Sequence, residues 1–393
     1  MARNLQAIYG GLCLCAVFQG VTEKPLFKAF EDYCLAKDGN VKRKAYARFV
    51  KAVYEEGGDL TALTKRLVSE DENVYVKTVA QKGKVNENVV CSAENELALF
   101  SVFGGLTRKD FADDMGVSER ELPDFSSVNA DMVSSYSERL ASLEKYGYGM
   151  FSSKPMFRLS DEGELEPIVS ADKISMAHFI GYEQQRAQIV ENTRAFVENR
   201  PYANALLCGD AGTGKSSTVK AVANSFFDQG VRLIELRKDQ LKRLPSVMAK
   251  ISGNPLKFII FIDDLSFNKN NDDFSMLKAS LEGSASVTAD NAVIYATSNR
   301  RHIIKESFGD REGDDVHRND TLQETLSLSE RFGLTVLFSK PDKALYLRIV
   351  RELAKRSGIT MDEKELDVKA EAFALKKGSR SARCAEQFIT SLL

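Results

Sequence analysis

Apolar residues recur at two spacings along the chain, and the change between them falls near residue 172. Before it the spacing is helical, as in "KAYARFVKAVYEEGG", where apolar residues occupy positions 45, 46, 49, 50, 53 and 54 and two glycines follow. After it, short apolar runs alternate with helical stretches. The pattern predicts a mostly helical N-terminal domain, followed by an α/β domain.

Five short apolar runs predict the strands of the second region: "ANALLCG", "VRLIEL", "KFIIFI", "NAVIYAT" and "LTVLF". Runs without alternation suit strands that are buried on both faces. Helical patterns such as "KSSTVKAVANSFFDQG" and "FSMLKASLEG" separate them, so we expect a five-stranded parallel, doubly wound sheet. Upstream, "YGYGMFSSKPMFRLSDEGELEPI" reads as an irregular or hairpin connector.

No strand pattern follows Pro341, where three helical segments close the chain. We therefore divide the sequence into three segments. These are a mostly helical N-terminal domain of unknown role over residues 1–172, an α/β core over 173–339 and a helical lid over 340–393.

The composition is that of a soluble globular protein, with 43% apolar residues and a formal net charge of −2. This balance argues against a strongly basic nucleic-acid coat. No apolar run is long enough to span a membrane. The cysteines show no C-x-x-C pair and no cluster with histidine, which disfavours zinc and suits a reducing compartment. We expect a cytoplasmic protein with no membrane contact.

The stretch "GDAGTGKSS" fits the P-loop pattern, with an apolar strand before it and a helix after it. Its glycines let backbone N–H groups turn toward one anion, and the helix N-terminus adds its positive end. Lys215 is placed to reach the β and γ phosphates, and the Ser216 hydroxyl to hold Mg²⁺. The expected phosphate-binding residues are Gly209, Asp210, Ala211, Gly212, Thr213, Gly214, Lys215, Ser216 and Ser217.

Polar residues end two of the predicted strands. Asp263 and Asp264 follow "KFIIFI", and Asn299 ends the run "NAVIYATSN". Ligands of open parallel sheets bind beyond the carboxyl ends of the strands. Asp263 then suits a Mg²⁺ ligand and Asp264 the group that polarises water, while Asn299 is placed to contact the γ-phosphate or that water. Guanine is disfavoured because "NKNN" at 268–271 lacks the aspartate that reads this base, so adenine is the better assignment.

Three arginines lie where a cation can reach a nucleotide. Arg331 in "SLSERFGL" lies just before the last strand and is placed to contact the γ-phosphate of a neighbouring subunit. Arg380 and Arg383 begin the final helix in "GSRSARCAEQF". Positive side chains oppose the dipole at a helix start, which indicates an anion bound from outside. Surface arginines paired with local acids are the plain alternative.

Taken in order, these motifs resemble those of the AAA+ ATPases. More narrowly, "GYEQQ", "LLCGDAGTGKSSTVKA", "FIDDLSF", "YATSNRRHII" and "GSRSARCAEQF" resemble a mainly bacterial AAA+ family known as domain of unknown function 815, over roughly residues 146–388. The resemblance implies Walker A, Walker B and sensor 1 roles for the P-loop, the aspartate pair and Asn299. It also implies an arginine finger at Arg331, sensor 2 at Arg383 with Arg380 as second choice, and a base pocket at Ile180 and Gly181.

The resemblance implies ATP hydrolysis with Mg²⁺, at interfaces of a homo-oligomer that forms with ATP, to remodel or load an unknown protein or nucleic-acid partner. Asp264 departs from the wider AAA+ pattern, in which the second Walker B acid is glutamate. A water displaced by about an ångström slows catalysis on the order of 10²-fold. A slow or non-hydrolysing switch or adaptor is therefore the alternative, and a P-loop kinase a third, against which the strand "VRLIEL" between the two phosphate motifs counts.

Within the N-terminal region, "LTRKDFADDMGVSEREL" resembles a helix-turn-helix. Its second helix would expose Glu119, Arg120, Glu121 and Asp124, whose net negative charge opposes contact with phosphates. We therefore favour a packing or protein-contact role over direct DNA binding for this element.

Overall fold

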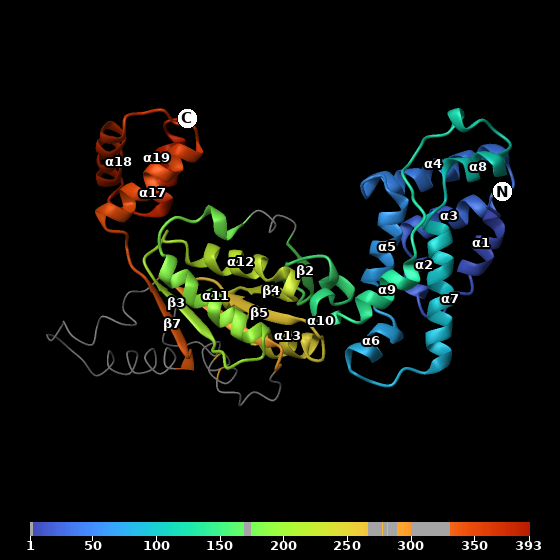
Figure 1. The fold of residues 1–393 in the computed structure, drawn as a ribbon, viewed down its shortest axis with the longest axis horizontal. Helices are drawn as coiled ribbons and strands as arrows, with labels where there is room; N and C mark the ends of the chain where they lie inside the picture. Colours follow the sequence, from blue (N-terminus) through green and yellow to red (C-terminus); the bar gives the residue numbers. More distant parts are fainter. Residues whose placement is uncertain (1–2, 169–173, 266–276, 278–280, 282–288, 300–330) are drawn as a thin grey trace. The chain divides into compact units, whose positions relative to one another are not determined.

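The computed structural model describes residues 3–168, 174–265, 277, 281, 289–299 and 331–393 (Figure 1). They form two compact units, Met1–Ser153 and Lys154–Leu393, and each is considered by itself. The predicted helix in "FSMLKASLEG" and the "NKNN" stretch fall largely or wholly outside the described residues.

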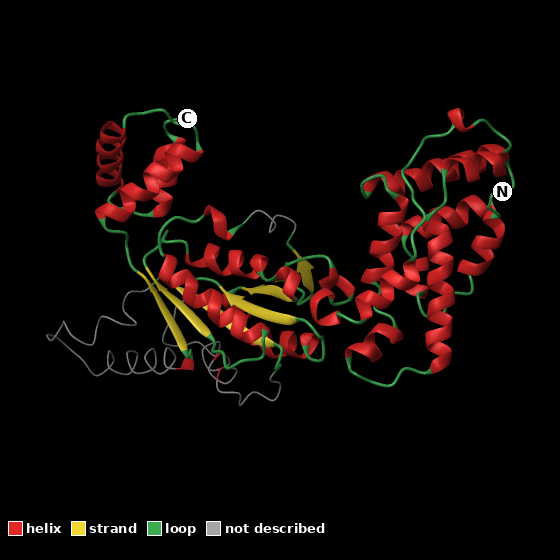
Figure 2. Cartoon of the chain, in the orientation of Figure 1, coloured by secondary structure: helices red, strands yellow, loops and turns green. Residues whose placement is uncertain are grey.

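The described part of the first unit consists of helices joined by short loops (Figure 2). Its aromatic core includes Phe27 stacked on Phe103 with centroids 4.5 Å apart and Phe111 edge-on to Tyr33 at 5.0 Å. Asparagine or aspartate caps most of the helix starts. Asp38, for example, accepts from the N–H of Asn40 and Val41. The helices are α1 (Leu5–Leu12), α2 (Gln19–Thr22), α3 (Pro25–Leu35), α4 (Gly39–Glu55), α5 (Leu60–Glu70), α6 (Val74–Ala80), α7 (Glu87–Gly104), α8 (Arg108–Met115), α9 (Met132–Leu140) and α10 (Leu143–Tyr146).

The second helix of the predicted helix-turn-helix does not form. After α8 the chain makes only a three-residue 3-10 turn, Glu119–Glu121. Leu122 and Phe125, which follow it, are buried in the core of the unit. Pro123 has no N–H and cannot continue a helix. Burial of its neighbours Leu122 and Phe125 in the core then sets the path of the chain. The resemblance to a helix-turn-helix therefore does not extend to a second helix that could read DNA.

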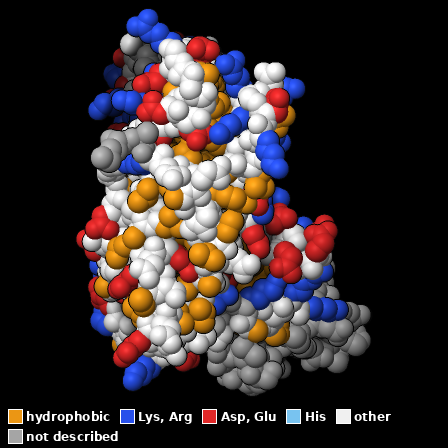
Figure 3. Space-filling view, turned by 90° about the vertical axis from the view of Figure 1, so that its right-hand side faces the viewer, with side chains coloured by type: hydrophobic (Ala, Val, Ile, Leu, Met, Phe, Trp, Pro, Cys, Tyr) orange, Lys and Arg blue, Asp and Glu red, His pale blue; other side chains and the backbone are white. Residues whose placement is uncertain are grey.

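The stretch that contains α1 carries no charged residue between Arg3 and Glu23. Leu14, just after α1, is 81% exposed. Figure 3 shows one face of the protein, on which apolar side chains lie toward the middle and most charged ones toward the edges. No single helix in the described ranges has both the length and the apolar content of a membrane span; α7 and α8 reach them only as a pair, bent by 81°.

The second unit is built on a sheet whose described strands follow the order β2-β1-β4-β5-β6-β3-β7. All neighbouring strands pair in parallel except β1 and β2, which are antiparallel. The five predicted strands are present. The strands are β1 (Met156–Leu159), β2 (Leu165–Pro167), β3 (Ala205–Gly209), β4 (Val231–Leu236), β5 (Lys257–Ile262), β6 (Ala292–Ser298) and β7 (Leu334–Phe338).

Helices α11 (Glu183–Val197) and α12 (Lys215–Ser225) pack on this sheet. Ile189 and Val219 from these helices share one core cluster with Leu207, Ile259 and Tyr295 from the strands. The β4–β5 connection carries a 3-10 helix, η6 (Lys238–Arg243), and α13 (Leu244–Ile251). The closing helices are α17 (Lys343–Arg356), α18 (Glu363–Lys377) and α19 (Ala382–Thr390). The predicted fold class is confirmed as an α/β core with a mostly parallel sheet and closing helices, preceded by a helical region; the sheet has seven described strands rather than the five predicted.

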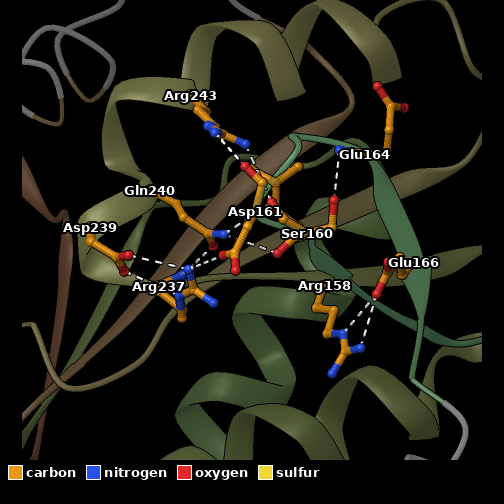
Figure 4. Close-up of polar contacts among 10 residues, drawn as sticks. Arg158, Ser160, Asp161, Glu164, Glu166, Arg237, Asp239, Gln240 and Arg243 are labelled. Carbon is orange, nitrogen blue, oxygen red and sulfur yellow. Dashed lines mark hydrogen bonds and ion pairs between the residues drawn. The ribbon is translucent and has the colours of Figure 1, made fainter.

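The predicted connector contributes two strands that the apolar pattern did not indicate. Its hairpin, β1 and β2, adds to the edge of the sheet through β4. Figure 4 shows polar side chains of the β4–β5 connection reaching the hairpin turn. Arg237 pairs with Asp161 at 2.6 Å, Gln240 donates to the carbonyl of Leu159 at 3.0 Å, and Arg243 donates to that of Asp161 at 2.6 Å. These bonds fix the hairpin on the sheet edge.

A buried carboxylate fixes the segment between α1 and α2. Glu96 on α7 is 8% exposed. It accepts hydrogen bonds from the backbone N–H groups of Ala16 at 2.9 Å, Val17 at 3.1 Å and Phe18 at 2.8 Å. Buried N–H groups that lose their acceptor cost free energy, so this one side chain stabilises the whole segment.

We expect Glu96→Ala to lower the free energy of unfolding of the first unit by roughly 3 kcal/mol, because it leaves three N–H groups without an acceptor. Urea-induced unfolding of the full chain, followed by circular dichroism, measures the change. Glu94→Ala, on the exposed side of the same helix, is the matched control. Equal urea midpoints for the two variants would show that Glu96 has no such role.

Candidate nucleotide-binding site

The P-loop connects β3 to α12 and depends on glycine at both of its ends. Gly209 has a φ of 136°, and a Cβ added there would lie 2.1 Å from the carbonyl oxygen of Phe338. Gly214 caps α12 with a φ of 88°. Both backbone conformations favour glycine. The loop therefore lies tightly against β7 and ends at a helix N-terminus, the arrangement that binds phosphate.

A cavity of about 420 Å³ opens beside this loop. It lies where parallel-sheet proteins bind ligands, at the carboxyl ends of β3, β5 and β6. Its size is within the range of sites for small molecules and cofactors. The lining residues are His178, Phe179, Ile180, Arg186, Ala211, Gly212, Thr213, Gly214, Lys215, Ser216, Ser217, Asp263, Asp264, Asn299, Ile349, Leu353, Ala382, Arg383 and Glu386.

Lys215 is folded back into the loop that carries it. Its side-chain nitrogen donates to the carbonyls of Gly209 at 3.1 Å and Asp210 at 2.7 Å, and to Asn299 Oδ1 at 2.9 Å. The residue is only 5% exposed. Burial lowers the pKa of the Lys215 ammonium, because it removes the charged form from water. An anion in the cavity would oppose that shift and stabilise the charged form.

Asp263 joins three elements through a single oxygen. Its Oδ1 accepts from Ser216 Oγ on α12 at 2.6 Å and from Thr297 Oγ1 on β6 at 2.6 Å. The donor set is made of hard oxygen atoms, which suits Mg²⁺. Ser216 Oγ and Asp263 Oδ1 thus lie side by side in the cavity lining.

Asp264 has a left-handed backbone, with a φ of 53°. Its N–H donates to Thr297 Oγ1 at 2.9 Å and lies 3.1 Å from Asp263 Oδ1. Its own Oδ1 accepts from Asn299 Nδ2 at 2.7 Å. One amide side chain, that of Asn299, therefore bridges Lys215 and Asp264.

The lid contributes to the cavity through the start of α19. A Cβ added to Gly212 would lie 3.3 Å from both Arg383 Cβ and Ser381 Oγ, so the helix start is close to the P-loop. Arg383 lines the cavity. Arg380 does not line it; its guanidinium donates to both Glu371 oxygens, at 2.9 and 2.7 Å. The structure thus places Arg383 at the cavity and Arg380 in an ion pair outside its lining.

The segment before α11 contacts both the cavity and the lid helix α17. Ile180 lines the cavity, whereas Gly181 contacts Leu345, whose Cδ1 would lie 2.5 Å from an added Cβ. Arg356 donates to the carbonyl of His178 at 2.8 Å, and Arg348 pairs with Glu183 at 2.6 Å. These contacts link α17 to the segment before α11, which we expect to bind the base.

The model of a family described as "Protein of unknown function (DUF815)" matches residues 152–393, which is more than half of the chain. The chain belongs to this DUF815 family. Among solved structures, the chain is similar to the Thermotoga maritima RuvB Holliday junction branch migration motor, at 12% identity over 56% of this chain and 73% of that one, with a TM-score of 0.35. Two variants of that RuvB give the same values. No curated protein matches the chain.

Arg331 of the DUF815 chain is not among the residues that line the cavity. Three residues after it, Leu334 pairs with Ala205 at the start of β3, whereas the P-loop follows the end of that strand at Gly209. Five strand residues span about 16 Å. Arg331 therefore lies toward the amino-terminal ends of the strands, whereas its own P-loop lies at their carboxyl ends.

Several residues that line the cavity, or contact a residue that does, were not predicted as site residues. Thr297 ends the same strand as Asn299, so its position carried a signal, but its contact with Asp263 depends on the register between β5 and β6. Arg186 is buried on α11 above the ring of Phe179, 5.3 Å from its centroid, and donates to the carbonyl of Gly181. Glu386 lies on α19, three residues after Arg383. Arg186 belongs to no motif named above, and Glu386 falls within "GSRSARCAEQF" without having been singled out there.

The left-handed backbone at Asp264 predicts how substitutions there affect stability. Aspartate and asparagine tolerate this region better than glutamate, because their short polar side chains bond locally. We expect Asp264→Glu to lower the free energy of unfolding by about 1 kcal/mol, and Asp264→Asn to change it by less. Urea unfolding of both variants in the absence of nucleotide measures this. A glutamate variant as stable as the wild type would contradict the backbone argument.

Proposed function

We propose that this DUF815 protein binds ATP with Mg²⁺ in the cavity beside the P-loop and hydrolyses it. The observation that carries the proposal is the convergence of Lys215, Ser216, Asp263, Asp264 and Asn299 on one cavity. These five residues come from three separate stretches of sequence. A structural glycine turn would not require a lysine, a hydroxyl, two carboxylates and an amide around the same space.

The phosphate end is formed by residues that already carry a partial or full positive charge. The backbone N–H groups of the P-loop and the start of α12 provide an anion site. Lys215 exchanges the carbonyls of Gly209 and Asp210 for phosphate oxygens, and Arg383 faces the same space from the lid. Phosphates are stronger acceptors for an ammonium than neutral carbonyls are, so the exchange favours binding.

The metal end is formed by Ser216 and Asp263. These two residues would hold Mg²⁺, which would supply positive charge against the negative charge that develops during phosphoryl transfer. Asp263 Oδ1 is held in place by Thr297, which keeps a carboxylate oxygen beside Ser216 Oγ. Mg²⁺ prefers such oxygen ligands and retains several waters, so two protein ligands are sufficient.

The attacking water is assigned to Asp264 and Asn299. Asp264 accepts the proton or polarises the water, and Asn299 orients it. Asn299 binds both Lys215 and Asp264, and a γ-phosphate competes for Lys215. Binding of ATP therefore frees Asn299 Oδ1 at the place where the water has to lie.

At the other end of the cavity, Ile180, Ile349 and Leu353 provide apolar walls for the base. We assign adenine, in line with the expectation from the sequence. The base would then contact both the core and α17, and Arg356 and Arg348 would transmit its presence to the lid. Movement of the lid on hydrolysis is the step proposed to remodel or load a protein or nucleic-acid partner.

A slow, ATP-dependent switch is the second candidate, and one observation favours it. Asp264 is short, and its carboxylate is engaged by Asn299 in the described site. A carboxylate held by its neighbour is poorly placed to take a proton until ATP rearranges both side chains. Tight binding with phosphate release near the background rate would favour the switch over the ATPase.

Lys215→Ala is expected to weaken ATP binding at least tenfold, because it removes a buried charge-assisted contact with phosphate. Titration with a fluorescent ATP analogue in the presence of Mg²⁺ measures the affinity, and phosphate release measures turnover. Lys220→Ala is the matched control, since Lys220 lies on the same helix outside the cavity lining and pairs with Glu235. Unchanged ATP affinity in Lys215→Ala would exclude this cavity as the ATP site.

The position of Arg331 supports a role at the neighbouring subunit's site within an ATP-dependent homo-oligomer. We expect Arg331→Ala and Lys215→Ala each to lose ATPase activity when assayed alone. An equal mixture of the two should regain a measurable part of the ATPase activity. In mixed assemblies, the intact Lys215 site of an Arg331→Ala subunit can meet the intact Arg331 of a Lys215→Ala subunit. A mixture that stays as inactive as the separate variants, under conditions where the wild type assembles, would contradict action between subunits.

A further inference from the structure

One carboxylate in the cavity has no part in the phosphate or metal chemistry. Glu386 on α19 is among the residues that line the cavity, and it is exposed. In the part of the chain that the structure describes, no hydrogen bond or ion pair engages its side chain; its backbone carbonyl accepts from Thr390. An unengaged acceptor in a ligand cavity is available to a hydrogen-bond donor on the ligand.

The charge of Glu386 excludes the triphosphate as its partner. Carboxylate and phosphate repel each other, and the cations Lys215 and Arg383 already serve the phosphate end. Beyond the phosphates, a nucleoside triphosphate presents donors only on its sugar and on the edge of its base. The ligand group facing Glu386 must be one of these.

The position of Glu386 on α19 selects the sugar. Arg383 and Glu386 are three residues apart, so they lie on one face of the helix about 4.5 Å apart along its axis. The start of the helix lies against Gly212 of the P-loop, which places Arg383 at the phosphates. One helical turn beyond the phosphates is the distance at which the ribose follows. The base, further on, has the apolar walls of Ile349 and Leu353.

We propose that Glu386 accepts hydrogen bonds from the 2′- and 3′-hydroxyls of the ribose and thereby selects ribonucleotides over 2′-deoxynucleotides. The inference rests on the proposed function, because it assumes a nucleoside triphosphate in this cavity. Because α19 belongs to the lid, the lid would contact the sugar through Glu386 and the phosphates through Arg383. Arg383 and Glu386 thus give one helix face two different specificities.

The test compares the affinities for ATP and dATP in the full-length protein with Mg²⁺. We expect the wild type to bind ATP about tenfold more tightly than dATP, as the loss of one hydrogen bond to a charged group implies. Glu386→Ala should bring this ratio close to one, and Glu386→Gln, which keeps a neutral acceptor, should leave it in between. Gln387→Ala, the next residue and outside the cavity lining, should keep the wild-type ratio.

Three outcomes would overturn the assignment, and they are distinguishable. If ATP binds and Glu386→Ala keeps the wild-type ratio, the carboxylate does not read the ribose. If Glu386→Ala instead loses the preference for ATP over the analogue that lacks the adenine amino group, the carboxylate reads the base. If the wild type binds neither nucleotide, the proposed function itself fails together with the inference.

Discussion

A single oxygen, Oδ1 of Asp263, holds the chemical end of the cavity together. It accepts hydrogen bonds from Ser216 on α12 and Thr297 on β6, while Asp263 itself follows β5. Charge-assisted hydrogen bonds of this length are among the stronger ones in proteins. Without that oxygen, Ser216 would lose its described contact with the strand ends, which would then be joined to the P-loop helix through Lys215 and Asn299. The registers of the sheet bring the groups near, and this carboxylate sets their spacing.

The P-loop is also tied to the start of the lid. Asp210 Oδ2 accepts from the N–H of Lys340 at 2.6 Å, and Tyr182 donates to the carbonyl of Ser339 at 2.6 Å. Both contacts lie in the few residues between β7 and α17, where the chain leaves the sheet. In the proposed function, the lid would pivot close to these residues, and a change at the phosphates would act on the pivot through Asp210.

The strands and the P-loop were predictable because local pattern and tertiary structure agree there. "KFIIFI" is apolar on both sides, and β5 is buried on both faces. The connector was expected to be irregular or a hairpin, but its place in the sheet was not predicted, because short strands with polar residues such as Arg158 and Glu166 give no signal of pairing with β4. The 3-10 turn at Glu119–Glu121 failed as a predicted helix for the same reason: burial of Leu122 and Phe125 overrides local spacing. Glu386 lies within "GSRSARCAEQF", but its place in the cavity is found only once α19 is placed against it.

The short acid at position 264 can be understood from its backbone. A left-handed backbone costs least for glycine, asparagine and aspartate, because other side chains crowd the carbonyl that follows. That conformation turns the N–H of Asp264 toward Thr297 Oγ1, and Thr297 Oγ1 in turn donates to Asp263. A glutamate would gain reach toward water but would strain the backbone that keeps the metal carboxylate in position. The aspartate pair is therefore a compromise in which the geometry of Asp263 limits the choice of side chain at 264, and turnover has to be achieved with the shorter acid.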